Sequence, residues 1–277
     1  MLRPDFPRDP ASMIDEILSR IFFNQTAVLV IVSTLLLLLA ETGYRFGRRS
    51  RRINPEFAEG HSSTIQGAVL GLLGLLLGFT FAMAVARYDS RRSLVLEEAN
   101  SIGTTWLRAD FLSPPQNREI KELLRRYTAL RIEGFDHSFD SPEMARIRGE
   151  VARIHRSLWS LGAAGAAGND SPLAAGFITS LNETIDLDAS RMAAARNHVP
   201  GAVWLLLMVV AGCGAWSSGF VSGAGGFRSA FSQWVFPLLI GVVITLISDI
   251  DRPRRGMISI SQKPLQELLE SLQPATP

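Results

Sequence analysis

The chain has 277 residues, of which 47% are hydrophobic and 19% charged, and its formal net charge is +2. A positive mean hydropathy at that charged fraction indicates that the apolar residues are concentrated in blocks. The near-neutral charge and the lack of a recognisable module argue against nucleic-acid binding. The single cysteine, Cys213, excludes an internal disulfide.

The first 20 residues are polar and charged, unlike a cleaved signal peptide. Residues 10–22 predict a short helix on the membrane surface, capped by Ser12. Its apolar face would carry Ile14, Ile17, Leu18 and Ile21.

Four segments approach the roughly 20 apolar residues that cross a bilayer. They cover residues 21–44, 64–86, 199–221 and 231–250. Within the second segment, glycines recur at spacings of four, three and four residues, which predicts either close helix packing or one face of a pore. These glycines are Gly67, Gly71, Gly74 and Gly78.

Residues 87–198 form a charged segment with helical periodicity. The second span is expected to continue as a helix into this segment. Further helices are expected over 117–135, over 141–162 and from 172 to about 198, and a flexible loop is expected over 162–172. The sequence predicts an all-α membrane protein with four transmembrane helices and a helical cytoplasmic bundle between spans two and three. The expected parts are 1–20, 21–86, 87–198, 199–250 and a tail, 251–277.

Orientation follows from the basic residues near the span ends. With both termini in the cytoplasm, twelve basic residues lie on that side and six outside. We therefore expect a multi-pass protein of the bacterial inner membrane with both termini cytoplasmic. The short segment between spans one and two, RFGRRSRR, opposes this assignment locally.

Two spans end in clusters of opposite charge. Charges at this depth are costly unless they are paired or reach the interface. We expect pairs between the two clusters, of Asp249 or Asp251 with Arg91 or Arg92 and of Asp89 with Arg254 or Arg255; the alternative is local pairing and anchoring to the cytoplasmic interface. The full set is Arg87, Asp89, Arg91 and Arg92 after span two, and Asp249, Asp251, Arg254 and Arg255 after span four.

The sequence offers no enzyme chemistry. Its four histidines lack metal-ligand spacing, and no phosphate loop or nucleophile motif is present. Glu183, Asp186 and Asp188 lie near one helix face and could hold a cation, but a solvated face or pairing with arginine is favoured. We expect no catalytic residue, metal or cofactor.

Residues 72–94, LLGLLLGFTFAMAVARYDSRRSL, resemble the second membrane helix of the bestrophin anion channels, through Leu77-Gly78-Phe79 and Arg87-Tyr88-Asp89. The four-span order with its large helical loop is also similar. Residues 87–112 and 249–265 look like blocks of the bacterial bestrophin-like membrane proteins, a family of largely unknown function.

The resemblance implies a homopentamer with a central pore for small anions such as chloride, surrounded by membrane lipid. The pore neck would fall on Phe79, Leu75 and Gly71, but the family has a bulky residue where Gly71 stands, so Leu72 or Leu76 could take its place. A positive pore mouth would comprise Arg48, Arg49, Arg51 and Arg52; alternatively, these arginines contact lipid headgroups.

An acidic calcium clasp after span four is lacking, so calcium gating is not expected. The alternative to a channel is a non-conducting membrane scaffold or signalling protein on the same fold.

Overall fold

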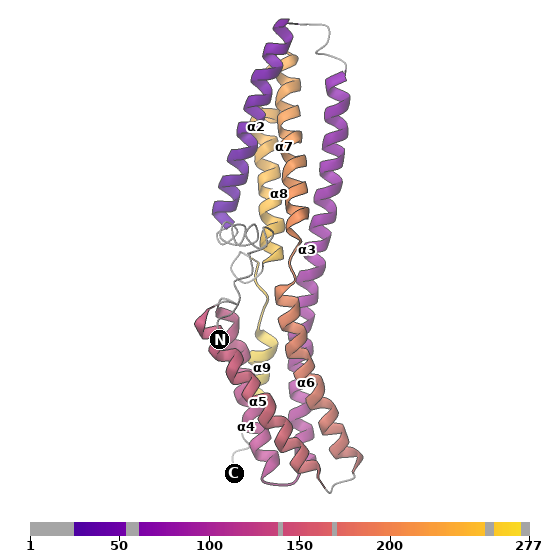
Figure 1. The fold of residues 1–277 in the computed structure, drawn as a ribbon, viewed down its shortest axis with the longest axis vertical. Coiled ribbons are helices and arrows are strands. Elements are labelled where there is room, and N and C mark those ends of the chain that lie inside the picture. The colour runs from indigo at the N-terminus through magenta and orange to yellow at the C-terminus, as the bar shows by residue number, and fades with distance from the viewer. Residues whose placement is uncertain (1–24, 54–60, 138–140, 168–170, 253–257, 273–277) are drawn as a thin grey trace, which may run out of the picture. The chain divides into compact units, whose positions relative to one another are not determined.

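The structure is a computed structural model that describes residues 25–53, 61–137, 141–167, 171–252 and 258–272. The expected surface helix over residues 10–22 lies outside these ranges. Every regular element of the described residues is helical (Figure 1). The elements are α2 (Gln25–Ile53), α3 (His61–Arg108), the 3-10 turn η1 (Ala109–Phe111), α4 (Gln116–Asp136), α5 (Pro142–Ala166), α6 (Pro172–Arg196), α7 (Gly201–Ala224), the π turn η2 (Phe231–Val235), α8 (Phe236–Asp251) and α9 (Lys263–Ser271).

Four helical segments are long and apolar enough to cross a membrane, and they contain α2, α3, α7 and α8. The all-α, four-span prediction is therefore confirmed. The chain divides into a membrane unit, residues 1–87 and 198–259, and a bundle unit, residues 88–197 and 260–277. Helix α3 runs through 48 residues without a break, so its first half belongs to the membrane unit and its second half to the bundle unit.

Helices α2 and α7 meet backbone to backbone through paired glycines. A Cβ atom at Gly43 would overlap the carbonyl oxygen of Trp216, and one at Gly219 would overlap that of Ala40. Gly47 and Gly223 have equally close carbonyl neighbours across the contact. Without a side chain at these positions the helices approach closely, which maximises packing where the hydrophobic effect is weak.

Helix α7 also packs against α3, on another of its faces. A Cβ at Gly212 would contact Leu39 of α2 at 3.1 Å, whereas one at Gly214 would contact Leu70 of α3 at 3.3 Å. Because two residues along a helix differ by about 200° in direction, these contacts lie on opposite sides of α7. Within the membrane unit, α7 therefore separates α2 from α3 (Figure 1).

The bundle unit is built from amphipathic helices that start at serine caps. The Ser141 hydroxyl accepts a hydrogen bond from the Met144 backbone N–H at 3.1 Å, and Ser171 similarly caps α6. Proline follows each cap, as suits the first helical position. The expected loop over residues 162–172 is wrong at its start, because α5 continues to Ala166.

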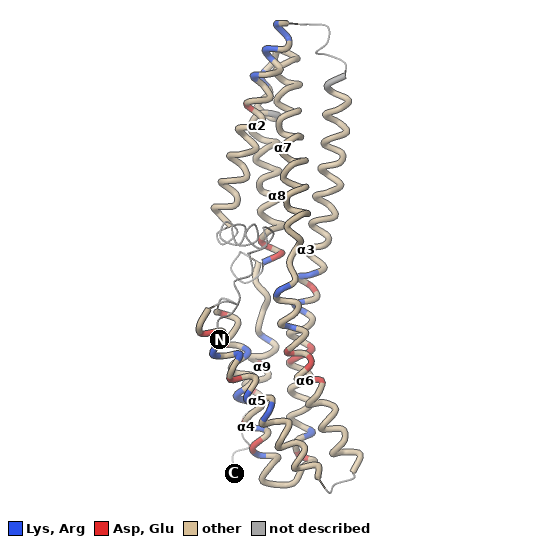
Figure 2. The backbone as a smooth tube through the Cα atoms, viewed as in Figure 1, with Lys and Arg blue, Asp and Glu red and all other residues tan. Residues whose placement is uncertain are grey.

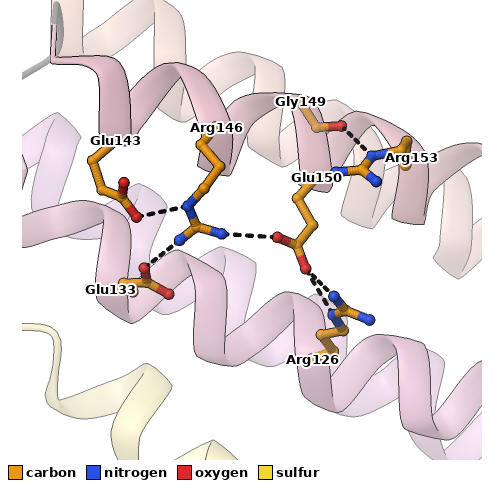
Figure 3. Close-up of polar contacts among 7 residues, drawn as sticks. All are labelled: Arg126, Glu133, Glu143, Arg146, Gly149, Glu150 and Arg153. Atoms are coloured by element: carbon orange, nitrogen blue, oxygen red, sulfur yellow. Dashed lines mark hydrogen bonds and ion pairs between the residues drawn. The ribbon is translucent and has the colours of Figure 1, made fainter.

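An ion-pair network joins α4 to α5 at the surface (Figure 3). Arg146 contacts Glu133 and Glu143, each at 2.6 Å, and Glu150 at 3.1 Å. Glu150 also accepts a hydrogen bond from Arg126 Nε at 2.8 Å. Because most of these side chains are exposed, the network contributes only modestly to the contact between the two helices.

The segment after span four belongs to the core of the bundle unit. Ile260, Leu265 and Leu272 are buried with the apolar stripes of α3, α4, α5 and α6. Helix α9 packs along α4, and its Leu268 lies 3.4 Å from a Cβ placed at Gly103 of α3. Residues 260–272 are thus a structural part of the bundle.

We expect Gly219→Ala to destabilise the membrane unit by about 1–3 kcal/mol or more, because the added methyl group meets backbone that cannot rotate away. Gly67→Ala is the matched control, since nothing lies within 4 Å of a Cβ there. The measurement is the thermal midpoint of the purified protein in detergent. An equal midpoint for both variants would contradict the close contact of α2 and α7.

Candidate functional site

One face of α3 in the membrane unit is apolar and has no partner within the described chain. Leu75 is 54% exposed and Phe79 63% exposed, and Leu72, one turn before Leu75, is also exposed. Leu73, Thr80 and Ala84, on the other side of the helix, are buried. The predicted neck residues therefore share the free face of this helix.

The four glycines of α3 flank this free face. A Cβ at Gly67, Gly71, Gly74 or Gly78 would find no described atom within 4 Å, apart from its own helix. Close packing within the chain, one of the two interpretations of these glycines, is therefore not observed. Gly71 lies beside the exposed leucines, and the neck assignment stays a prediction.

The expected pore-mouth arginines all lie in the last turns of α2 (Figure 2). Arg48, Arg49, Arg51 and Arg52 are all exposed, and the guanidinium of Arg51 lies over Gly226, where it fills the space that a Cβ would take. Gly226 has a φ of +77°, in the left-handed region that favours glycine. The role of these arginines at a pore mouth stays a prediction.

The acidic side of the two charge clusters is buried. Asp251 is 1% exposed, and its two carboxylate oxygens accept hydrogen bonds from the Val199 backbone N–H at 3.1 Å. Asp249 is 4% exposed and accepts from the Ile258 backbone N–H at 3.1 Å. These two carboxylates tie the end of α8 to the start of α7 and to the chain that follows.

The basic side has backbone partners of its own. Arg91 is buried and donates to the carbonyl oxygens of Ala194, at 3.0 Å, and Asn197, at 2.6 Å, at the C-terminal end of α6. Arg87 is partly buried, and Asp89 and Arg92 are exposed. The pairing of Arg91 or Arg92 with Asp249 or Asp251 stays a prediction, and Arg254 and Arg255 lie outside the described residues.

The bundle unit contains a buried ionic cluster that the sequence analysis missed. Glu98 of α3 is fully buried, and it pairs with Arg131 of α4 at 2.8 Å and with Arg191 of α6. Tyr127 donates its hydroxyl hydrogen to Glu98 at 2.5 Å. Arg131 reaches Asp188 of α6 at 2.6 Å.

This ionic cluster also reaches the chain after span four, because Arg191 donates to the Gln262 side chain at 3.2 Å. It holds two acidic and two arginine side chains, so its formal charges balance. His155 of α5 lies beside it, with its ring centroid 5.1 Å from that of Tyr127 and its Nε2 atom buried without a hydrogen-bond partner among the described residues.

Burial and neighbouring charge shift the titration of this cluster. Burial raises the pKa of Tyr127 well above its usual value, and Glu98 adds to that shift. Burial opposes the charge on Arg131, but Glu98 and Asp188 outweigh it, so the pKa of Arg131 is raised. Burial also lowers the pKa of His155, and Arg131 lowers it further against the opposing effect of Asp188. The imidazole is therefore held neutral.

The acidic run on α6 is divided between solvent and ion pairs. Asp188 pairs with Arg131, Asp186 accepts from the Asn182 amide at 3.2 Å, and Glu183 is exposed. In this run, Asp188 thus pairs with arginine, and Glu183 faces solvent.

Two other places could hold a small ligand. Potential metal-ligand atoms of Glu133, His137 and Glu143 lie within 4.8 Å of one another, but Arg146 already pairs with both carboxylates. A surface pocket of about 490 Å³ lies between α4 and α5. It is lined by Glu119, Glu122, Leu123, Ser157, Ser160 and Leu161.

One signal could have located the ionic cluster. Glu98 falls three residues after Val95 and four before Ile102, at a position where the helical period requires a buried side chain. A carboxylate in a core position demands cationic partners. The sequence alone could not say which arginines supply them.

We expect Glu98→Gln to lower the free energy of unfolding by about 3–5 kcal/mol, since it leaves Arg131 and Arg191 without their shared carboxylate. Glu133→Gln, at an exposed pair, should cost less than about 1 kcal/mol. Denaturant unfolding followed by circular dichroism compares the two. Similar losses would show that the ionic cluster does not stabilise the bundle.

We expect acid to weaken the bundle through His155. The unfolded imidazole gains its proton as the pH falls through about 6.5, whereas the folded one gains it only at lower pH, so stability is full above pH 6.5 and declines below it. His155→Gln should reduce the drop in thermal midpoint between pH 7.5 and pH 5.5, and His137→Gln, outside the ionic cluster, should not. An unchanged drop in the His155 variant would refute this.

Comparison with known proteins agrees with these features. The model of the Bestrophin-like domain matches residues 29–265. A point mutant of a bacterial bestrophin homologue from Klebsiella pneumoniae aligns with a TM-score of 0.65 at 14% identity, covering 87% of this chain and 97% of that chain. The bacterial bestrophin homologue from Klebsiella pneumoniae solved by zinc phasing gives 0.63 at 14%, covering 86% and 94%.

No curated protein matches the sequence. The family model covers most of the chain, the solved structures share its fold, and the chain has four apolar helices long enough to cross a membrane. The chain is therefore a multi-pass membrane protein that belongs to the bestrophin-like family.

Proposed function

We propose that this protein is a homopentameric channel that passes small anions such as chloride through a central pore lined by α3. The observation that carries the proposal is the free face of α3, on which Leu75 and Phe79 stand exposed one helical turn apart. In a ring of identical subunits each such position contributes a complete girdle of side chains.

The composition of this face favours a protein axis over lipid. The four glycines beside Leu75 and Phe79 contact nothing in the described chain. Glycine at an exposed membrane position gives little apolar contact with lipid, but it lets another helix approach closely. The outer face of α2, by contrast, carries Val30, Ile31, Leu35 and Leu38.

The neck would control conduction by wetting and width. Two stacked apolar girdles form a passage that water can vacate, and a dewetted passage does not conduct. Gly71 adds no bulk one turn further along, and the exposed Leu72 lies seven residues from Phe79 on the same face. The proposed neck therefore consists of Leu75 and Phe79, with Leu72 as the third contributor.

The arginine distribution supports placement in a bacterial inner membrane with both termini and the bundle unit in the cytoplasm. Fold similarity to solved bacterial bestrophin homologues supports the channel class. The small residue at Gly71 favours the second candidate, a non-conducting membrane scaffold or signalling protein on the same fold.

We expect Leu75→Ala combined with Phe79→Ala to raise chloride flux several-fold above wild type in proteoliposomes, because the neck becomes wider and wetted. The matched control is Leu205→Ala with Val209→Ala, two exposed apolar residues one turn apart on α7. Light scattering after size-exclusion chromatography checks assembly. If the double neck variant assembles but passes no more chloride than empty liposomes, the scaffold function replaces the channel.

A further inference from the structure

The outer stripe of α2 changes abruptly from apolar to basic. Ile31 is 49% exposed and Leu38 59% exposed, on the side opposite the buried face that contacts α7 and α8. The same stripe continues through Arg45, Arg49 and Arg52, at steps of seven, four and three residues. Along this face of α2, apolar side chains in the first part of the helix are followed by arginines in its last turns.

The change falls where a bilayer changes from acyl chains to headgroups. A hydrocarbon core of about 30 Å takes about 20 helical residues. The apolar run of α2 ends at Ala40, and the polar end of the helix with Glu41 and the arginines follows directly. At 1.5 Å per residue, the helix from Arg45 to Arg52 spans roughly 10 Å beyond that boundary. The arginines therefore lie at headgroup depth.

Glu41 is the one acidic side chain that the structure describes at the arginine end of the membrane unit. Glu41 pairs with Arg45 at 2.9 Å and with Arg228 at 3.0 Å, and it accepts a hydrogen bond from Gln233 at 2.7 Å. Among the described residues, no carboxylate pairs with Arg48, Arg49 or Arg52. An anion can therefore balance the charge of these three arginines.

Exposed aromatic rings lie beside the arginines. Phe46 is 62% exposed and lies 6.5 Å from the ring of Trp216, which stacks on Phe220 at 5.3 Å. Tryptophan side chains concentrate at the membrane interface, and the two phenylalanine rings extend the apolar surface around Trp216. They give the arginine row an apolar border suited to the upper part of a lipid.

The arginine row also faces away from α3. Helix α7 contacts α2 through Gly212 and α3 through Gly214, on opposite sides, and the arginine stripe lies on the side of α2 that α7 does not cover. We propose that Arg48, Arg49 and Arg52 bind the phosphate groups of anionic phospholipids in the leaflet at this end of α2.

The experiment titrates the full-length protein in neutral detergent with dioleoyl phosphatidylglycerol or phosphatidylcholine and counts bound lipids by native mass spectrometry. We expect wild type to prefer phosphatidylglycerol. Arg48→Gln/Arg49→Gln/Arg52→Gln should lose about fivefold in that preference for each arginine removed, from roughly 1 kcal/mol per basic side chain near an anionic surface.

The charge-matched control is Arg118→Gln/Arg125→Gln/Arg156→Gln, at exposed arginines of the bundle unit. It should keep the wild-type preference. If the triple variant of α2 does not fold, Arg49→Gln alone should show a single fivefold loss. A salt concentration of 1 M, where the Debye length is about 3 Å, should weaken phosphatidylglycerol binding in wild type.

Several results would overturn the proposal. Equal lipid preference in wild type and the α2 variant would show that these arginines bind no phospholipid. Displacement of phosphatidylglycerol by millimolar inorganic phosphate would indicate a site for free anions. Unchanged lipid binding with loss of chloride flux at low salt would assign the same arginines to the pore mouth.

Discussion

The backbone contact between α2 and α7 sets the arrangement of the membrane unit. Four glycines place these helices so close that a methyl group at any of them would overlap a carbonyl oxygen. Helix α7 then has α2 on one side and α3 on the other, and α8 packs mainly against α2. Because α2, α7 and α8 pack mainly against one another, one face of α3 has no partner among the described residues, and that face carries the proposed neck.

The bundle unit depends on a different kind of constraint. Its core contains a carboxylate, Glu98, that is wholly removed from solvent. Glu98 pairs with arginines of α4 and α6, and one of these arginines also reaches the chain after span four. Buried ion pairs contribute little net stability, but loss of one partner is costly, so they penalise wrong registers. We regard the ionic cluster as the device that fixes how α3, α4 and α6 align, with His155 adding sensitivity to acid.

Much of the fold was predictable because its signals are local. Apolar runs of about 20 residues identified the spans, and helical periodicity identified α4, α5 and α6. The end of α5 was wrong because the alanine- and glycine-rich run was interpreted as a loop. Packing of Gly162 against Phe177 and of Gly165 against Leu112 extends the helix there.

Partners distant in sequence were not predictable. The sequence drew attention to the glycines of α3, yet the closest glycine contacts are those of Gly43 and Gly219. Each begins a GxxxG spacing, with Gly47 and Gly223, that could have marked the contact, but the spacing does not say which helix is the partner. Glu98 was placed on a helix, but its arginines come from α4 and α6, 33 and 93 positions later. For the neck, the sequence supplied the residues through a resemblance, and the structure adds that they share an exposed face.

The orientation of the free face of α3 in the assembled protein is the central claim, and one map tests it most directly. Electron cryo-microscopy of the full-length protein in lipid nanodiscs should show a fivefold ring in which Leu75 and Phe79 of every subunit point toward the common axis. A ring in which these two residues face lipid, or particles that contain a single subunit, would contradict the account.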